Sequence, residues 1–257
     1  MALELNNKKS FGSAYYRRYS GNIFRPLFGV KPGIIKMIRR MVPGGRLFDV
    51  GCGMGHFLQA AAGYYQVCGM EGSEYAASQA GRLTGLDGRV MVGNAEKALP
   101  LKDGSCDIIT ALDVVEHLSR PENFIHEAHR LLKPGGLLVI STPNPDSIGK
   151  TIKNKQWSGY RDPTHVNILP TEGWENLMKE EFDLKRTFYD GLWDSPYFLR
   201  NGFWALPVIR ALVGLTQSLL IVLPFIVLNS LGFGSSRRLG ENLWIFARKK
   251  DDEQHHG

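Results

Sequence analysis

The sequence predicts an α/β protein with a doubly wound, mostly parallel sheet and a helical apolar insert before the last strand. Two observations lead to this fold class. Short apolar runs alternate with helical segments, which is typical of parallel sheets covered by helices. A glycine-rich turn, Gly51-Cys-Gly-Met-Gly55, separates the first apolar run from a helical segment. The chain has 257 residues, 43% hydrophobic and 22% charged, so it can bury one substantial core plus an appendage.

Residues 8–42 predict two helical pieces that break between Gly29 and Pro32. In the second piece the apolar side chains share one face and the basic ones the other, an amphipathic pattern that packs beside a sheet. The apolar face consists of Ile34, Ile35, Ile38 and Met41, and the basic face of Lys36, Arg39 and Arg40. Upstream lie Tyr15, Tyr16 and Tyr19, for which two interpretations stay open: they close over a bound cofactor, or they are ordinary interface aromatics.

The glycine turn follows a predicted strand over 46–50 and precedes a predicted helix over 56–63. Glycines at 51, 53 and 55 remove every Cβ from one side of the backbone, so a ligand can lie against main-chain amides and the positive end of the helix. In the dinucleotide pattern G-x-G-x-x-G the third glycine falls where this chain has His56, and Asp49 stands two residues before the first glycine. Both features argue against NAD. The alternative is a glycine-rich turn without a ligand.

Six further strand-like runs follow in order, over 65–71, 89–92, 106–112, 137–141, 183–190 and 241–248. The run over 65–71 ends in Glu71, about twenty residues past the glycines, where an acid accepts hydrogen bonds from both ribose hydroxyls of an adenosine. A helix from Pro121 to Lys133 ends at Pro134-Gly-Gly136, before the run over 137–141.

From Arg46 to about Thr142 the chain resembles class I S-adenosylmethionine (SAM)-dependent methyltransferases. The resemblance rests on Asp-x-Gly-x-Gly-x-Gly at the first strand and on three later motifs that have counterparts in the branch containing ubiquinone-biosynthesis O-methyltransferases. These are Asp113-Val-Val-Glu-His-Leu118, Leu131-Leu-Lys-Pro-Gly-Gly136 and Ser141-Thr-Pro-Asn144. The resemblance implies a Rossmann-like sheet of seven strands, closed by an antiparallel pair at 183–190 and 241–248.

The resemblance also implies SAM as cofactor and a set of residues that hold it. The glycines pass under its amino-acid end and the acid before them supports the turn. Asn94 replaces the usual Asp beside the adenine, where its carbonyl oxygen can accept from the exocyclic amine while the next amide donates to the ring. The implied set is Asp49, Gly51, Gly53, Gly55, Glu71, Asn94, Ala95 and Leu112.

An oxygen acceptor is favoured by one departure from related enzymes. Methyltransferases that act on amide or nucleobase nitrogens carry Asn/Asp-Pro-Pro-Tyr/Phe after the fourth strand, and this chain has Leu112-Asp-Val-Val115 there. The resemblance implies a divalent metal at Asp113, Glu116 and His117, whose i, i+3 and i+4 spacing puts them near one face of a helical turn; oxygen ligands suit Mg²⁺. Alternatively, the two acids favour the positive end of a helix and the histidine packs against the cofactor.

His165 is the candidate catalytic base, with Asp162 as the group that orients it. Methyl transfer from a sulfonium is an in-line displacement, so the protein mainly positions the acceptor, and a base is needed only for a hydroxyl acceptor. The segment 157–165 follows the fifth strand, where acceptor loops lie, and offers a histidine with a useful pKa. The alternative is that His165 only caps the loop before the next helix.

The cysteines and the charge pattern indicate where the protein works. Cys52, Cys68 and Cys106 form no CxxC or Cys/His cluster, which predicts a reducing compartment and no structural zinc. The N-terminus has no apolar segment typical of a signal peptide, so a cytoplasmic location is expected.

Residues 1–46 carry ten Lys/Arg against one acid, residues 197–250 seven against one, and residues 47–196 fourteen against twenty acids. Basic ends suit nucleic acid or anionic membrane.

The apolar insert decides between these partners in favour of the membrane. Residues 211–228 carry no charge and reach the lower length of a transmembrane helix, but the last strand must return to the sheet. Pro207 and Pro224 instead predict a helical hairpin in one leaflet, flanked by Arg200, Arg237 and Arg238. A buried lid or a dimer interface is the alternative, and the oligomeric state stays open.

These observations divide the chain into four parts. They are a helical cap (1–45), a SAM-binding core (46–190), the insert (191–240) and the last strand with a tail (241–257). The first hypothesis is O-methylation of an amphiphilic or lipid-like small molecule by a protein attached to the inner face of a membrane, without nucleic acid. The others are the same chemistry on a soluble sugar or secondary metabolite, and a SAM-binding module without catalysis.

Overall fold

The computed structural model describes Ser13, Tyr15, Tyr16, residues 32–190 apart from 84 and 87, and residues 237, 238 and 240–250. Its strands are β1 (Arg46–Val50), β2 (Gln66–Glu71), β3 (Val90–Val92), β4 (Cys106–Leu112), β5 (Leu132–Pro143), β6 (Phe182–Asp190) and β7 (Asn242–Lys249). Its helices are α4 (Pro32–Met41), α5 (His56–Ala61), α6 (Glu74–Gly81), η1 (Val115–His117), α7 (Pro121–Leu131), α8 (Ile148–Lys153), η2 (Asn154–Gln156), α9 (Ser158–Arg161) and α10 (Thr171–Met178).

The seven strands form one sheet in the order β3-β2-β1-β4-β5-β7-β6. Strands β1 to β5 pair in parallel, and β7 runs antiparallel to both β5 and β6. The predicted seven-stranded, mostly parallel sheet is therefore confirmed, including its antiparallel pair. The strand order reverses between β1 and β4, and ligands of open α/β sheets bind at the carboxyl ends of the strands at such a point.

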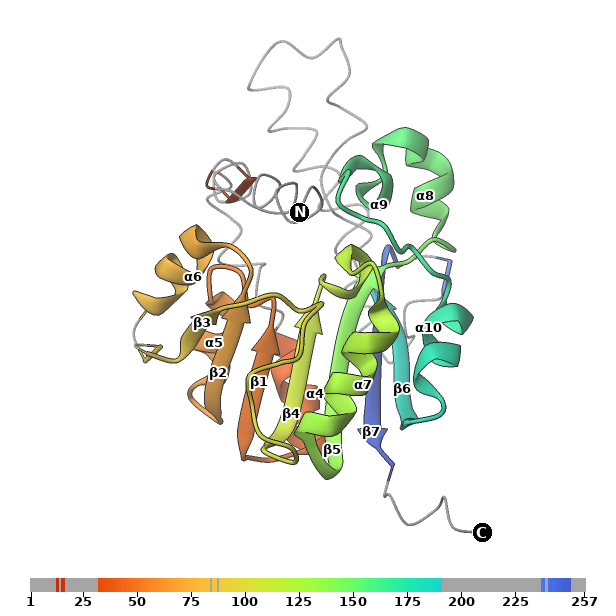
Figure 1. The fold of residues 1–257 in the computed structure, drawn as a ribbon. Coiled ribbons are helices and arrows are strands. Elements are labelled where there is room, and N and C mark those ends of the chain that lie inside the picture. The colour runs from red at the N-terminus through yellow and green to blue at the C-terminus, as the bar shows by residue number, and fades with distance from the viewer. Residues whose placement is uncertain are drawn as a thin grey trace.

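Helices cover both faces of the sheet (Figure 1). On one face, α7 and α10 pack Phe124 and Trp174 into a cluster with Phe48 and Ile140 of the strands. On the other face, α4 and α5 pack against a second buried cluster. The amphipathic prediction for residues 33–42 is confirmed, since Ile34, Ile35 and Ile38 are buried while Lys36, Arg39 and Arg40 are exposed.

Strand β5 begins earlier than the sequence pattern predicts. We expected a helix as far as Lys133 and a turn at Pro134-Gly-Gly136, but α7 ends at Leu131 and Leu132 already pairs with Cys106 of β4. A register shift between Cys106 and Ile108 takes up the extra residues. Proline and glycine normally indicate the end of a strand or helix. Here they lie inside β5, because irregular strand pairing tolerates residues that a regular ladder does not.

Most of the apolar insert, with the predicted hairpin around Pro207 and Pro224 and the flanking Arg200, lies outside the described residues. Within the described ranges, each helix is too short or too polar to span a bilayer. The three cysteines are free thiols.

Candidate active site

The glycine turn lies at the carboxyl end of β1 and its three glycines all adopt left-handed backbone conformations. Their φ angles are 71° at Gly51, 54° at Gly53 and 80° at Gly55. A Cβ on Gly51 would lie 2.4 Å from a methyl of Val114, and one on Gly55 would lie 2.8 Å from the Cβ of Ala80. Any side chain at either position would therefore be strained and would displace its neighbour.

Three backbone amides of this turn donate hydrogen bonds to other groups of the protein. Gly51 N and Cys52 N donate to the carbonyl of Met70 at 2.7 and 3.1 Å, and Gly53 N donates to the Glu71 carboxylate at 2.8 Å. This corrects one expectation from the sequence, because these three amides do not face a ligand. They hold the end of β1 against the end of β2.

Two buried carboxyl groups stand beside the turn. Asp49 is 2% exposed and accepts a 2.6 Å hydrogen bond from the Thr110 hydroxyl. Glu71 is 5% exposed and accepts from Gly53 N and, at 2.9 Å, from Ser73 N. Burial raises the pKa of Asp49 to about 7; the Thr110 hydrogen bond lowers it and the negative charge of Glu71 adds to the rise. Two acids in a poorly solvated place favour a cationic ligand over an anion such as a pyrophosphate.

Two tyrosines from the N-terminal region reach this edge of the sheet. The Tyr16 hydroxyl donates to Glu71 Oε1 at 2.9 Å, and its ring is the nearest group to the open side of Gly53. The Tyr15 hydroxyl donates to Asp162 Oδ2 at 3.1 Å. This favours the interpretation that the tyrosines close over the site, while Tyr19 lies outside the described residues.

The remaining residues expected around a cofactor lie at the same edge. Leu112 ends β4, and Asn94 and Ala95 follow β3. The Asn94 side-chain oxygen accepts from Glu96 N at 2.9 Å, which leaves one of its two lone pairs for an exocyclic amine.

Asp113 occupies a different place from the one its spacing suggests. It has a φ of 56° and precedes the short turn η1, so it does not share a helical face with Glu116 and His117. Its Oδ1 accepts a 2.9 Å hydrogen bond from the Ser141 hydroxyl of β5. The i, i+3, i+4 argument fails because a left-handed residue interrupts the helical geometry.

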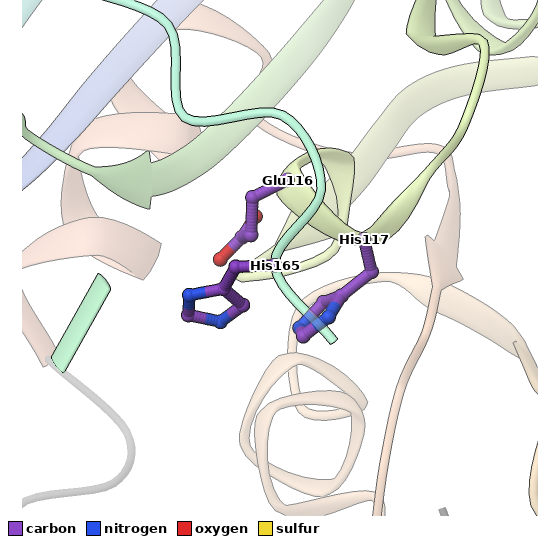
Figure 2. Close-up of side chains that lie close together, drawn as sticks. All are labelled: Glu116, His117 and His165. Carbon is purple, nitrogen blue, oxygen red and sulfur yellow. The ribbon is translucent and has the colours of Figure 1, made fainter. Parts of the chain in front are cut away.

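A third side chain joins Glu116 and His117 instead. The amides of Val166 and Asn167 both donate to the Glu116 carbonyl at 2.9 Å, which docks the loop after α9 onto η1. His165 is thereby brought beside them, and one ligand atom each of Glu116, His117 and His165 lies within 4.8 Å of the others. Figure 2 shows the three side chains converging from η1 and from this loop.

The hydrogen bonds around the two imidazoles define their tautomers. His165 Nδ1 lies 2.9 Å from the Gly159 carbonyl, which can only accept, so Nδ1 carries the proton and Nε2 the lone pair. The Thr164 hydroxyl donates to Asp162 at 2.5 Å and lies 2.8 Å from His117 Nδ1, so that nitrogen donates as well. Asp162 therefore orients His117 through Thr164, and the expectation that it orients the His165 ring is corrected.

Burial sets the charge state of this cluster. It lowers the pKa of His117 to about 4, helped by the neighbouring His165 and opposed by Asp162, so His117 is neutral near pH 7. Glu116 is 1% exposed; burial, with the charge of Asp113, raises its pKa well above the usual range. Its Oε2 atom is buried and has no hydrogen-bond partner. A metal implied by the resemblance fits this cluster, but with His165 rather than Asp113 as the third donor.

Comparison with known proteins identifies the family. A model of the methyltransferase domain matches residues 29–185 of the chain. The chain belongs to the class I SAM-dependent methyltransferases. A ubiquinone biosynthesis O-methyltransferase from Hahella chejuensis is 31% identical to it over 189 residues, which cover 69% of this chain and 76% of the relative. That of Pseudomonas aeruginosa is 34% identical over 128 residues, or 47% of this chain. This match covers 55% of the relative's length.

Solved structures of methyltransferases share the fold. A SAM-dependent methyltransferase from Archaeoglobus fulgidus superimposes with a TM-score of 0.58 at 21% identity, covering 90% of this chain and 100% of its own. Phosphoethanolamine N-methyltransferase 2 of Haemonchus contortus, in complex with SAM, gives a TM-score of 0.56 at 21% identity over 85% of this chain and 52% of its own.

Several residues of the methyltransferase site were not singled out from the sequence. Thr110, Ser141 and Thr164 each hydrogen-bond an acid of the site, and Gly159 fixes the His165 ring. Thr110 has a recoverable signal, since it is a polar residue in the middle of an apolar strand run. Such a buried hydroxyl needs a partner. Ser141 opens a motif quoted from the sequence, but with no role assigned to its hydroxyl, and Gly159 of α9 and Thr164 of the following loop carry no comparable signal.

We expect SAM affinity to rise with pH because a cationic ligand favours the ionised form of Asp49. With its pKa near 7, the affinity should increase about fivefold between pH 6 and pH 7 if only the ionised form binds. Calorimetry at both pH values, repeated with Asp49→Asn, measures this. The Asn variant keeps the shape but should bind weakly and show no such rise, and an equal rise in both proteins would contradict the prediction.

Proposed function

We propose that this methyltransferase transfers the methyl group of SAM to a hydroxyl oxygen of an amphiphilic small molecule. The observation that carries the proposal is the pair of buried carboxyl groups, Asp49 and Glu71, at the carboxyl ends of β1 and β2. SAM carries a sulfonium and an ammonium, and such a site stabilises both. A cofactor with a pyrophosphate would meet two negative charges instead.

The residues around SAM take the roles that their positions support. Glu71 accepts from the ribose hydroxyls once the Tyr16 hydroxyl has left Oε1. Asn94 and Ala95 meet the adenine, Leu112 borders it, and the turn from Gly51 to Gly55 passes under the amino-acid end. Asp49 supports that turn. Placing the acceptor oxygen in line with the methyl carbon can supply up to about 7–11 kcal/mol of the rate enhancement.

His165 activates the acceptor hydroxyl in this proposal. The oxygen attacks the methyl carbon, the carbon–sulfur bond breaks with its electron pair going to sulfur, and the hydroxyl proton leaves toward the histidine. The Nδ1 hydrogen bond to the Gly159 carbonyl keeps the lone pair on Nε2. Asp162 has a positioning role, since it accepts from Tyr15 and Thr164 and so ties the N-terminal tyrosines to this loop.

The returning end of the insert supports an amphiphilic acceptor. Asn144 Nδ2 donates to the carbonyls of Arg237 and Gly240 at 2.7 and 2.8 Å, directly after β5. Lys153 of α8 and Glu241 form a buried ion pair at 2.6 Å. Residues 237, 240 and 241, at the end of the insert, therefore lie beside the segment that follows β5, and α8 and α9 lie above the carboxyl ends of the strands (Figure 1).

Of the two arginines at the end of the insert, only one remains available to an anionic membrane surface. Arg237 pairs with both Asp146 and Glu172, so it is already neutralised, whereas Arg238 is exposed. We propose that Arg238, the apolar insert and the basic N-terminal region meet an anionic membrane surface from the cytoplasmic side. The quinone-type acceptor suggested by the relatives' name fits such a surface.

One experiment tests acceptor class and membrane contact together. Membrane and soluble fractions of a cell extract are incubated separately with the protein and methyl-labelled SAM, and the label is partitioned between organic and aqueous phases. We expect label in the organic phase of the membrane sample and the protein to sediment with those membranes. Label confined to the aqueous phase would indicate a sugar or other soluble metabolite. If neither phase contains label from either cell fraction although the protein binds SAM, the protein would be a SAM-binding module without catalysis.

A further inference from the structure

We propose that Glu116, His117 and His165 bind a divalent transition-metal ion of the zinc type, with His165 in the place that the sequence pattern gives to Asp113. This deepens the proposed function and rests on it only for the ion's use in activating the acceptor. The binding itself stands on the geometry of the described residues.

The three donors are held together by backbone contacts rather than by chance proximity. Glu116 and His117 are neighbours in η1, and His165 is fixed because the next two residues, Val166 and Asn167, donate to the Glu116 carbonyl. Their ligand atoms lie within 4.8 Å of one another. Donors around a tetrahedral ion with bonds of about 2.0–2.1 Å lie about 3.4 Å apart, so small side-chain rotations bring them to bonding positions.

Both imidazoles are prepared as ligands by the groups behind them. His165 Nδ1 donates to the Gly159 carbonyl, and His117 Nδ1 faces two oxygens of Thr164 at 2.8 and 3.2 Å. Asp162 lies behind Thr164 and accepts from its hydroxyl. A metal-binding histidine typically has its other nitrogen held by a carbonyl or a carboxylate in this way, which fixes the ring and directs Nε2 at the ion.

The carboxyl group supplies the second, independent observation. Glu116 is 1% exposed, yet its Oε2 atom has no hydrogen bond of ordinary geometry, although the Thr142 hydroxyl is close enough to favour the carboxylate. A buried carboxylate oxygen needs a better partner than this, and a bound cation would provide one. Asp113, by contrast, has its Oδ1 engaged with the Ser141 hydroxyl.

The donor set selects the kind of ion. Two imidazoles and one carboxylate suit zinc and its neighbours, whereas Mg²⁺ requires oxygen donors in octahedral geometry. The Mg²⁺ suggested by the sequence pattern is therefore replaced in the proposal. Three protein ligands leave a position open, and an ion there would supply a Lewis acid that lowers the pKa of an acceptor hydroxyl. With the ion bound, the Nε2 lone pair of His165 would be a ligand, so the ion would take over from His165 the role of activating the hydroxyl and the proton would leave to solvent.

The test is a metal titration without acceptor or SAM. The full chain, with His255 and His256 of the tail replaced by Ala so that they do not compete, is stripped with a chelator and titrated with Co²⁺, whose visible absorption reports nitrogen ligands. We expect one equivalent to bind, Zn²⁺ to displace it and millimolar Mg²⁺ to leave it in place. Glu116→Gln and His165→Ala should each weaken binding by at least about tenfold.

Asp113→Asn is the matched control, because its amide oxygen can still accept from Ser141; it should bind Co²⁺ like the parent. SAM calorimetry on every variant shows that it is folded. The metal proposal would be overturned if Asp113→Asn lost Co²⁺ binding while His165→Ala kept it. It would also be overturned if the parent bound SAM but no Co²⁺. Methyl transfer measured in the extract assay would still support the proposed function in that case, so the metal proposal can fail without it.

Discussion

Glu71→Ala should lower the affinity for SAM by about a hundredfold or more, because it removes a charged acceptor of two ribose hydrogen bonds, each worth about 1.5–3 kcal/mol. It also frees the amides of Gly53 and Ser73, which now donate to this carboxylate. Glu71→Gln keeps the size and one acceptor oxygen, so its loss should be smaller. Calorimetry with SAM and with its demethylated product measures both variants.

Glu74→Gln is the matched control for this prediction. Glu74 lies three residues away in the first turn of α6 and is exposed, so its variant should bind SAM like the parent. An unchanged affinity in Glu71→Ala, or equal losses at Glu71 and Glu74, would remove the ribose assignment and with it the basis of the cofactor site.

His165→Ala should lower kcat by about a hundredfold to ten-thousandfold, the usual range for a group that assists proton removal. SAM affinity should change little, since this ring lies with Glu116 and His117 on the acceptor side. Initial rates with the acceptor found in the extract assay, combined with SAM calorimetry, measure both quantities. His126→Ala on α7 is the control, because that side chain is 73% exposed and contacts only Glu181 among the pairs described. A normal kcat in His165→Ala would make His165 a structural residue, and the metal titration shows whether its ring holds an ion.

The sheet, and the position of the glycine turn and the two acids at one edge of it, could be predicted because they depend on local patterns. Buried strands appear as apolar runs, α4 appears as an amphipathic repeat, and the glycine turn needs residues that accept positive φ. The acid at the end of β2 follows from its position in such a fold. These features are determined by residues that are close in the sequence.

The arrangement of the acceptor side depends on contacts between distant residues, and the sequence pattern misjudged it. The family resemblance and the i, i+3, i+4 spacing group Asp113 with Glu116 and His117, but Asp113 has a positive φ and its side chain accepts from Ser141, 28 residues later. His165 joins the cluster through backbone bonds that link η1 to a loop about 50 residues away. Side-chain spacing within one segment does not contain that information. The hydrogen bond from Tyr16 to Glu71 joins residues 55 apart and is likewise not visible in the pattern of one segment.

The pairing of β6 with β7 also bears on how freely the apolar insert can change. Asp190, the last residue before the insert, and Asn242, the first residue of β7, lie directly opposite each other in the antiparallel ladder. The chain therefore leaves the sheet and returns to it at one point, as a hairpin would. Loop-closure entropy grows only with the logarithm of length, so an insert of this size costs roughly 2 kcal/mol more than a four-residue turn. Evolution can therefore lengthen, shorten or exchange this segment at little cost in stability; under the proposed function such a change would alter the acceptor and leave the opposite half of the sheet, with Asp49 and Glu71, unchanged.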